Sequence, residues 1–367
     1  MTLVYFAPVP WDSYAQRAHY FARHFLRREG RAVIWVDPYP ARLPAWRDLR
    51  RLGAPTLATP RPPNLTVISL VAPPIEPLPG GRWVNRRFLW RRLRARLEPL
   101  IAGRTIGVGV GRPSTLALEA LESLRPAWSL YDAMDDFPEF YRGWSRDSVD
   151  TLERAIASRV DLIITTSTGL WTKFAAHGSR RVMVRNAFEM SSLPPMGIPA
   201  DGDPVFGYLG CVGDWFDWSL VCRLARSAPH ASVQIVGPRT TTPRGLPDNI
   251  TLMPACRHEE GVEHLRRFSV GLIPFKRTRL TEAVDPIKYY AYRGMGLPVL
   301  ATRFGGMHAH SRTEGTHFFD DHPGLGRVAR DVLDQRTDVE TIDRFRVSHD
   351  WRRRFRDASL FDQFLPS

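Results

Sequence analysis

The sequence predicts two consecutive α/β domains, each built on a parallel β-sheet. Three observations carry this prediction. The chain has 367 residues, which is longer than a chain that ordinarily forms a single hydrophobic core. Short apolar runs alternate with helical stretches. A stretch rich in proline and glycine interrupts this alternation at 191–204. We expect a first domain over 1–190, a linker over 191–204, a second domain over 205–340, and a helical region over 341–367 that returns to the first domain. Two such domains would enclose a deep cleft, a usual place for ligands.

The elements follow from the local patterns in order. LVYFA is a continuous apolar run, typical of a strand buried on both faces, and the helix after it stops at Gly30. In the first half we expect strands at 3–7, 33–36, 65–70, 106–110, 128–131 and 162–165, and helices at 14–28, 85–101, 114–124, 147–158 and 168–177. In the second half we expect strands at 205–209, 232–236, 271–274 and 297–301.

Composition places the chain among globular proteins of a reducing compartment. Hydrophobic residues make up 43% and charged residues 24%, and no apolar run approaches the roughly 18–20 residues that span a bilayer. The first residues lack the basic and apolar segments of a signal peptide. Cys211, Cys222 and Cys256 form no CxxC pair and are odd in number. We therefore expect a cytoplasmic location.

Positive charge is concentrated in the first half. The net charge is +13; residues 1–200 hold 28 basic against 17 acidic residues, and 201–367 hold 23 against 21. Such an excess attracts nucleic acid, anionic lipid or an acidic substrate. No nucleic-acid-binding motif accompanies it, so we expect no nucleic-acid partner. Only three basic residues are lysines, namely Lys173, Lys276 and Lys288.

One lysine lies in a pattern typical of an anion site. In AVDPIKYYAYRGMGLPVLAT (283–302), Asp285 and Pro286 form a turn and helix start, and Ile287 and Lys288 begin the helix. Lys288 would lie beside unsatisfied backbone N–H groups and the positive end of the helix dipole, which suits a diphosphate. The alternative is a solvated helix lysine.

PIKYYAYRGMGLPVLAT resembles the PxKxxEYxxxGxPVVAT signature of GT-B-fold glycosyltransferases. The similarity is to bacterial polysaccharide enzymes of the teichuronic-acid glycosyltransferase and xanthan glucuronosyltransferase types. It implies two Rossmann-like domains facing a cleft, and a nucleotide sugar (a UDP-sugar rather than a GDP-sugar) held by the second domain without metal or cofactor. The acceptor would be lipid-linked or a glycan. The implied donor-binding residues are Gly210, Gly213 and Asp214 in GYLGCVGDWFDW, Gly237 in IVGP, Phe275, Arg277, Asp285, Pro286, Ile287 and Lys288.

The chain departs from this signature at one position. The family places a glutamate, which hydrogen-bonds the donor ribose, five residues before the motif glycine, and Ala291 occupies that position. The E-x7-E signature of retaining enzymes is therefore absent. We expect an inverting transfer with a carboxylate base.

Four carboxylates follow a predicted strand in SLYDAMDDFPEF, namely Asp132, Asp135, Asp136 and Glu139. An inverting transfer needs a group that accepts the acceptor's hydroxyl proton, and crowding raises carboxyl pKa values. The resemblance to a Y-x-A-x-D-x segment implies that Asp135 is the base. The alternative is that these acids cap the next helix or pair with nearby arginines, which we favour for Asp136 and Glu139.

The first helix and the stretch 80–101 offer further candidates. Arg17 and Asp132 are candidates for binding acceptor or phosphate, and His19 is an alternative base, although a lone helical histidine is often structural. In GGRWVNRRFLWRRLRARLEPLI, arginines and aromatics share an amphipathic helix that would lie on anionic lipid. The membrane candidates are Arg86, Arg87, Trp90 and Arg91. The alternative is a surface helix whose Trp and Leu residues face the core.

Taken together, these features favour a glycosyltransferase of bacterial surface-glycan assembly, located on the inner face of the cell membrane. Two alternatives remain open. The first is a nucleotide-sugar epimerase of the same fold. The second is a non-catalytic basic module that binds membrane or RNA.

Overall fold

The structure is a computed structural model of the chain, and it describes residues 1–39, 60–72, 75–78, 80–194, 202–335 and 337–361. The chain divides into two compact units, Met1–Val184 with Phe355–Ser367 (unit 1) and Arg185–Arg354 (unit 2). The first unit therefore ends six residues before the boundary expected at 190. Residues 195–201 of the expected linker lie outside the described residues.

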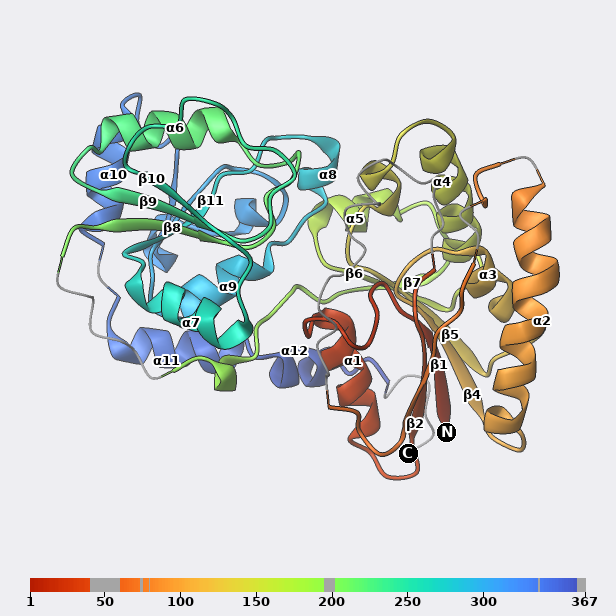
Figure 1. The fold of residues 1–367 in the computed structure, drawn as a ribbon. Helices are drawn as coiled ribbons and strands as arrows, with labels where there is room; N and C mark the ends of the chain where they lie inside the picture. Colours follow the sequence, from red (N-terminus) through yellow and green to blue (C-terminus); the bar gives the residue numbers. More distant parts are fainter. Residues whose placement is uncertain (40–59, 73–74, 79, 195–201, 336, 362–367) are drawn as a thin grey trace. The chain divides into compact units, whose positions relative to one another are not determined.

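Unit 1 contains a parallel sheet in which the described strands run in the order β3-β2-β1-β4-β5-β6-β7. Helix α1 covers one face of this sheet, and α2 and α3 cover the other (Figure 1). The strands are β1 Thr2–Phe6, β2 Ala32–Val36, β3 Leu65–Ile68, β4 Ile106–Val110, β5 Trp128–Ala133, β6 Leu162–Thr165 and β7 Arg180–Met183. The helices are α1 Arg17–Leu26, α2 Gly81–Ile101, α3 Thr115–Ser123, α4 Gly143–Ala157 and α5 Thr168–Lys173.

The core of unit 1 forms because its strands are apolar on both faces and its helices on one. All five residues of β1 are buried, as expected for an inner parallel strand. In α1 the buried residues Ala18, Phe21, Ala22 and Phe25 recur at helical spacing. The end of the chain completes this face, because the Phe361 ring lies 5.0 Å from that of Phe25. The expected return of the C-terminal region thus involves the residues from Phe355 onward, while 341–354 belong to unit 2.

Unit 2 contains a second parallel sheet, with its described strands in the order β10-β9-β8-β11-β12-β13. Helices α6 and α10 lie on one face, and α7, α9 and α11 on the other (Figure 1). The strands are β8 Val205–Leu209, β9 Ser232–Val236, β10 Ile250–Met253, β11 Val270–Ile273, β12 Val299–Ala301 and β13 Thr316–Phe318. The helices are α6 Trp218–Ser227, α7 His258–Arg267, α8 Arg279–Glu282, α9 Ile287–Gly294, α10 Leu325–Leu333 and α11 Val339–Ser348, and α12 Trp351–Asp357 leads back to unit 1.

The strand order reverses once in each sheet, between β1 and β4 in unit 1 and between β8 and β11 in unit 2. In open parallel sheets, ligands bind outside the carboxyl ends of the strands at such a switch point. The residues that follow β8 and β11 are therefore the first place to look for a ligand site in unit 2. No helix among the described residues is long and apolar enough to cross a membrane.

The contact between β4 and β5 gives a test of the packing in unit 1. A Cβ atom on Gly107 would lie 2.2 Å from ring atoms of Trp128, its partner in the sheet. Gly107→Ala should therefore lower the free energy of unfolding by about 1–3 kcal/mol, because the indole has to move within a packed core. Gly178→Ala is the control, since nothing lies within 4 Å of that position. Urea denaturation measures both, and equal midpoints would refute the tight packing.

Candidate functional site

Two glycine turns meet at the carboxyl edge of the sheet in unit 2. Gly210 follows β8 with φ of 142°, and Gly237 follows β9 with φ of 134°, where other residues are strained. A Cβ atom on Gly237 would lie 2.3 Å from the carbonyl oxygen of Gly210, and the Gly210 N–H donates to the Val236 carbonyl at 2.9 Å. The backbones of the two turns therefore touch, and neither turn carries a side chain at the point of contact.

Lys288 lies directly beside this contact. Its Nζ is 4.9 Å from the ring centroid of Tyr208 and 5.4 Å from that of Phe275, and a Cβ atom on Gly210 would lie 2.9 Å from it. Tyr208 belongs to β8 and Phe275 follows β11, so the ammonium stands at the switch point of the sheet. Two aromatic faces stabilise a cation there.

The charge of Lys288 has no acidic partner in the part of the chain that the structure describes. The side chain is half-buried, and desolvation lowers its pKa from 10.5 to about 8, whereas the electrostatic effect of the nearby Cys211 acts in the opposite direction. Lys288 is also the second residue of α9, after Pro286, which is buried at the N-cap. The first N–H groups of a helix have no intrahelical acceptor. This combination suits an anion that supplies the missing negative charge.

The loop after β8 is fastened to the end of β11. The backbone N–H of Asp217 donates to Pro274 and that of Lys276 to Trp215, at 2.8 and 2.7 Å. A Cβ atom on Gly213 would lie 2.6 Å from the Trp215 ring, so a larger residue would displace that ring. Asp214 is exposed, and its carbonyl accepts from Lys276 Nζ at 3.0 Å. Gly213 thus shapes the loop around the switch point.

The other residues expected to bind the donor are arranged differently. Ile287 is half-buried at the start of α9, whereas Arg277 is exposed and forms an ion pair with Asp320 at 3.0 Å. No motif of the sequence indicated Arg239. This residue is half-buried and donates to the carbonyls of Gly237 and Met253 at 3.1 and 2.5 Å. Its position after IVGP was the only available signal. Arg239 adds a second cation next to the glycine turns.

Asp285 is structural rather than a ligand contact. Its buried carboxylate accepts from the backbone N–H of Asn186 at 2.6 Å and from the Tyr290 hydroxyl at 3.0 Å. Its carbonyl accepts from the Asn186 side chain at 2.6 Å. Desolvation raises its pKa, and these hydrogen bonds act against the rise. The expectation that Asp285 binds the donor is therefore corrected: its acceptors already hold protein donors that fix the start of α9.

In unit 1, Arg17 and Asp132 form a buried ion pair with each other. Arg17 Nε lies 3.0 Å from both carboxylate oxygens of Asp132, and a second guanidinium nitrogen lies 2.9 Å from one of them. Arg17 also donates to the Val184 carbonyl at 2.9 Å. Both side chains are almost fully buried. The expected role in binding acceptor or phosphate is corrected, because each charge is neutralised by the other.

Two more of the clustered carboxylates are also engaged with cations. Asp136 accepts from Lys173 Nζ at 2.6 Å, and Lys173 also pairs with the buried Glu153. Glu139 pairs with Arg146 at 2.6 Å. These ion pairs hold the turn after β5 and the 3₁₀ helix Phe137–Phe140 against α4 and α5.

Asp135 differs from its neighbours, because its carboxylate forms no ion pair or hydrogen bond within the described residues. It is half-buried, and desolvation raises its pKa from 3.8 to about 7. The positive charge of Arg17 lowers this pKa, and the negative charges of Asp136 and Asp132 raise it. A partly exposed carboxyl with a pKa near neutrality can accept and release a proton at physiological pH.

His19, the alternative base, has both ring nitrogens occupied by backbone groups. The Gln16 N–H donates to Nδ1 at 3.1 Å, so Nε2 carries the proton and donates to the Trp11 carbonyl at 3.0 Å. The ring is fully buried between Trp11 and Trp35, and desolvation lowers its pKa. We therefore assign His19 a structural role, because no ring nitrogen is left to take a substrate proton.

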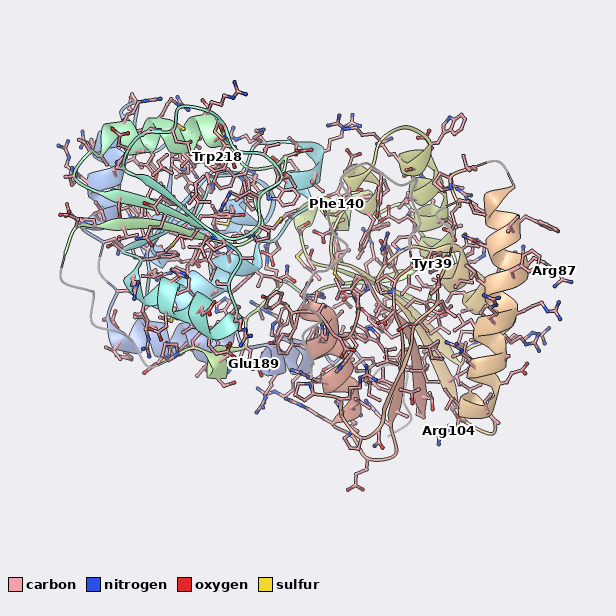
Figure 2. All side chains as sticks on the ribbon, in the orientation of Figure 1. Tyr39, Arg87, Arg104, Phe140, Glu189 and Trp218 are labelled. Carbon is pink, nitrogen blue, oxygen red and sulfur yellow. The ribbon has the colours of Figure 1, made fainter. Side chains whose placement is uncertain are left out.

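The stretch expected to lie on lipid forms α2, with a different orientation from the one expected. Trp90 is only 7% exposed and packs in the core, so it is not a membrane contact. Arg86 pairs with Glu119 at 2.5 Å. Arg87 and Arg91 are exposed, and Figure 2 shows Arg87 pointing away from the sheet. The apolar face of α2 is thus used inside unit 1.

Comparisons with solved structures place this fold among known ones. No family model and no curated protein matches the sequence. A structure described as trehalose-6-phosphate from E. coli bound with UDP-2-fluoro glucose is similar over 100% of both chains, with a TM-score of 0.66 at 11% identity. A lipopolysaccharide outer core galactosyltransferase, WaaB, has a TM-score of 0.64 at 9% identity, over 99% of this chain and 100% of its own. A structure from Listeria monocytogenes, described as a "putative UDP-N-acetylglucosamine 2-epimerase", has a TM-score of 0.51 at 12% identity over 99% of this chain and 96% of its own. The chain therefore has the two-unit GT-B fold.

The buried pair in unit 1 gives a test of the structural role of Arg17. Arg17→Met should lower the free energy of unfolding by about 3–5 kcal/mol, because Asp132 is left buried without a counter-charge. Arg94→Met, which removes one partner of the exposed pair between Arg94 and Glu98, should cost less than about 1 kcal/mol. Urea denaturation measures both. If Arg17→Met is as stable as Arg94→Met, the pair does not stabilise unit 1 and the structural role of Arg17 is wrong.

Proposed function

We propose that this chain is a glycosyltransferase whose unit 2 binds a nucleotide sugar through its diphosphate. The observation that carries the proposal is the ammonium of Lys288, held between two aromatic rings at the switch point, at the start of α9, with no carboxylate partner in the described residues. A diphosphate supplies the charge and the hydrogen-bond acceptors that this position lacks. The similar structures support this assignment, since one is bound with UDP-2-fluoro glucose and another is a galactosyltransferase.

The same lysine gives the reaction its electrostatic component. When the bond between the sugar and the diphosphate breaks, negative charge develops on the leaving group. Lys288 and the first N–H groups of α9 stabilise that charge, and the proposal requires no metal ion. We propose a UDP-sugar rather than a GDP-sugar as donor, because two of the similar structures carry UDP-sugars in their descriptions.

Asp135 is the base in this proposal. The acceptor's hydroxyl oxygen attacks the anomeric carbon, the bond to the diphosphate oxygen breaks with its electron pair, and Asp135 takes the hydroxyl proton. A single displacement of this kind inverts the anomeric configuration. The support is that Asp135, unlike the three neighbouring acids, has no cation bound to its carboxylate, together with its raised pKa.

We propose a lipid-linked or glycan acceptor in bacterial surface-glycan assembly, bound by unit 1 on the inner face of the cell membrane. The support is the excess of arginine in residues 1–200, which suits an anionic surface or substrate. An epimerase of the same fold is the second candidate, because one similar structure is described as a "putative UDP-N-acetylglucosamine 2-epimerase". Incubation with UDP-sugars separates the two: an epimerase yields an isomeric UDP-sugar without acceptor, and a transferase yields UDP and a glycosylated acceptor.

The donor assignment predicts the effect of removing one ammonium. Lys288→Ala should weaken UDP binding by about 1.5–3 kcal/mol, the range for a charge-assisted contact, with little change in melting temperature. Lys276→Ala is the matched control, because this exposed lysine of the same unit donates to a backbone carbonyl, and it should cost much less. Isothermal titration calorimetry measures both. Unchanged affinity of Lys288→Ala for UDP and GDP would remove Lys288 from the site.

The base assignment predicts both a rate and a pH profile. Asp135→Asn should lower turnover by about 10²–10⁴-fold and leave UDP affinity nearly unchanged. In the unmodified enzyme the rate should fall as the pH drops below about 7, because Asp135 then carries a proton in the folded protein, and the variant should lack this limb. Asp136→Asn is the control and should cost less. A product of retained configuration, read by NMR, would exclude Asp135 as the base of a single displacement.

A further inference from the structure

The side of α2 that faces away from the core carries exposed charge together with exposed aromatic rings. Trp83 and Phe88 are 65% and 59% exposed. Arg87, Arg91 and Arg92 are exposed as well, and none forms an ion pair with a described carboxylate. We call these five residues the α2 surface, and Arg87 marks it in Figure 2.

The spacing brings these residues together along one side of the helix. Trp83, Arg87 and Arg91 follow each other at intervals of four, and Phe88 lies three and four residues before Arg91 and Arg92, so each has a neighbour in the group. The helix spans 21 residues, or about 31 Å at 1.5 Å per residue. The α2 surface is thus a row of cations with a ring at two places along it.

The arginines of the α2 surface do not stabilise the helix itself. The stretch Gly81–Ile101 contains seven arginines and one acid, Glu98, which pairs with Arg94 at 2.7 Å. Arg87 and Arg91 are like charges four residues apart, which disfavours a helix. A negatively charged partner would remove this repulsion, so the α2 surface points to an anionic partner outside unit 1.

We propose that the α2 surface docks on a phospholipid bilayer with anionic headgroups. Arginine side chains bind headgroup phosphates, and Trp and Phe rings are favoured at the level of the headgroups. Each arginine close to such a surface strengthens binding by about fivefold. A bilayer uses the charges and the rings of the α2 surface together, and no motif of a nucleic-acid-binding domain accompanies them in the sequence. This inference deepens the proposed function, on which its purpose rests, because a lipid-linked acceptor resides in a bilayer.

Docking uses the side of α2 opposite to its apolar face. Leu89, Trp90, Leu93 and Leu97 are buried in unit 1, so the helix stays packed while its outer side meets the headgroups. The contact therefore needs no unfolding or rotation of α2. It should be shallow and sensitive to salt, since exposed charges carry most of it.

Co-sedimentation of the full chain with vesicles tests the proposal. The protein should sediment with vesicles of equal parts phosphatidylglycerol and phosphatidylcholine, and much less with phosphatidylcholine alone or at high salt. The triple variant Arg87→Gln, Arg91→Gln, Arg92→Gln should bind about 100-fold more weakly, at about fivefold per arginine. The double variant Trp83→Ser, Phe88→Ser should also bind more weakly, although it keeps every charge.

A matched control separates the α2 surface from net charge. Arg223, Arg244 and Arg267 are exposed residues of unit 2, and replacing all three by Gln removes the same charge, so this variant should bind like the unmodified protein. Equal loss in the control overturns the proposal, as does absence of binding to the anionic vesicles. Retention by a polynucleotide without vesicle binding, or a dimer that the Trp83→Ser, Phe88→Ser variant dissociates, overturns it in favour of another partner. Because neither donor nor acceptor is present, these outcomes leave the UDP-binding test of Lys288 independent.

Discussion

A parallel sheet brings the carboxyl ends of all its strands to one edge, and both groups of candidate residues are built from the turns at such an edge. In unit 2, β8 ends before Gly210 and β11 before Phe275, and Lys288 stands over the ends of both strands. In unit 1, β5 ends immediately before the turn that carries Asp135. The touching backbones of Gly210 and Gly237 keep the edge of unit 2 open next to the lysine. A side chain at Gly210 would meet the Lys288 ammonium, and one at Gly237 would meet the Gly210 carbonyl.

Protein partners, whether ion pairs or hydrogen bonds, distinguish structural charges from candidate functional ones at these edges. A buried charge is costly unless it is paired, and several buried charges of the described residues are paired with a cation or carboxylate of the chain, as Arg17 is with Asp132 and Glu153 with Lys173. The residues left over are then informative. Lys288 and Asp135 are each half-buried and have no ionic partner among the described residues, so a ligand that provides the complementary group would be bound where the protein itself has none.

The sequence was a good guide to inner strands and to local motifs, and a poor one to long-range pairing. The strands β4, β6, β8 and β9 occupy the predicted residues, because buried strands read as apolar runs. The missed strands, β7, β10 and β13, lie at sheet edges; they are three or four residues long, and β7 and β10 are partly exposed and partly polar.

Lys288 could be found because helix start and lysine are adjacent in sequence. The partner of Arg17 lies 115 residues away, and that of Asp285 lies 99 away, so no local pattern could assign either residue to the structure. Trp90 was misassigned because an amphipathic pattern does not reveal which face meets the core.

One physical cause, desolvation, moves the two candidate groups in opposite directions toward neutral pH. It raises the pKa of Asp135 to about 7 and lowers that of Lys288 to about 8, since burial disfavours the charged form of either group. The raised pKa makes Asp135 a stronger base than an ordinary aspartate. At neutral pH its carboxyl is nevertheless ionised in a large fraction of the molecules. For the lysine, the shift is one that a bound diphosphate would reverse, because a nearby negative charge favours the ammonium. In the proposed function, the cost of leaving the lysine without a carboxylate would be recovered on binding of the diphosphate, and the charge stabilisation would increase as the leaving group gains negative charge. A carboxylate of the protein beside Lys288 would reduce this stabilisation of the leaving group, because it would neutralise the ammonium before the substrate binds.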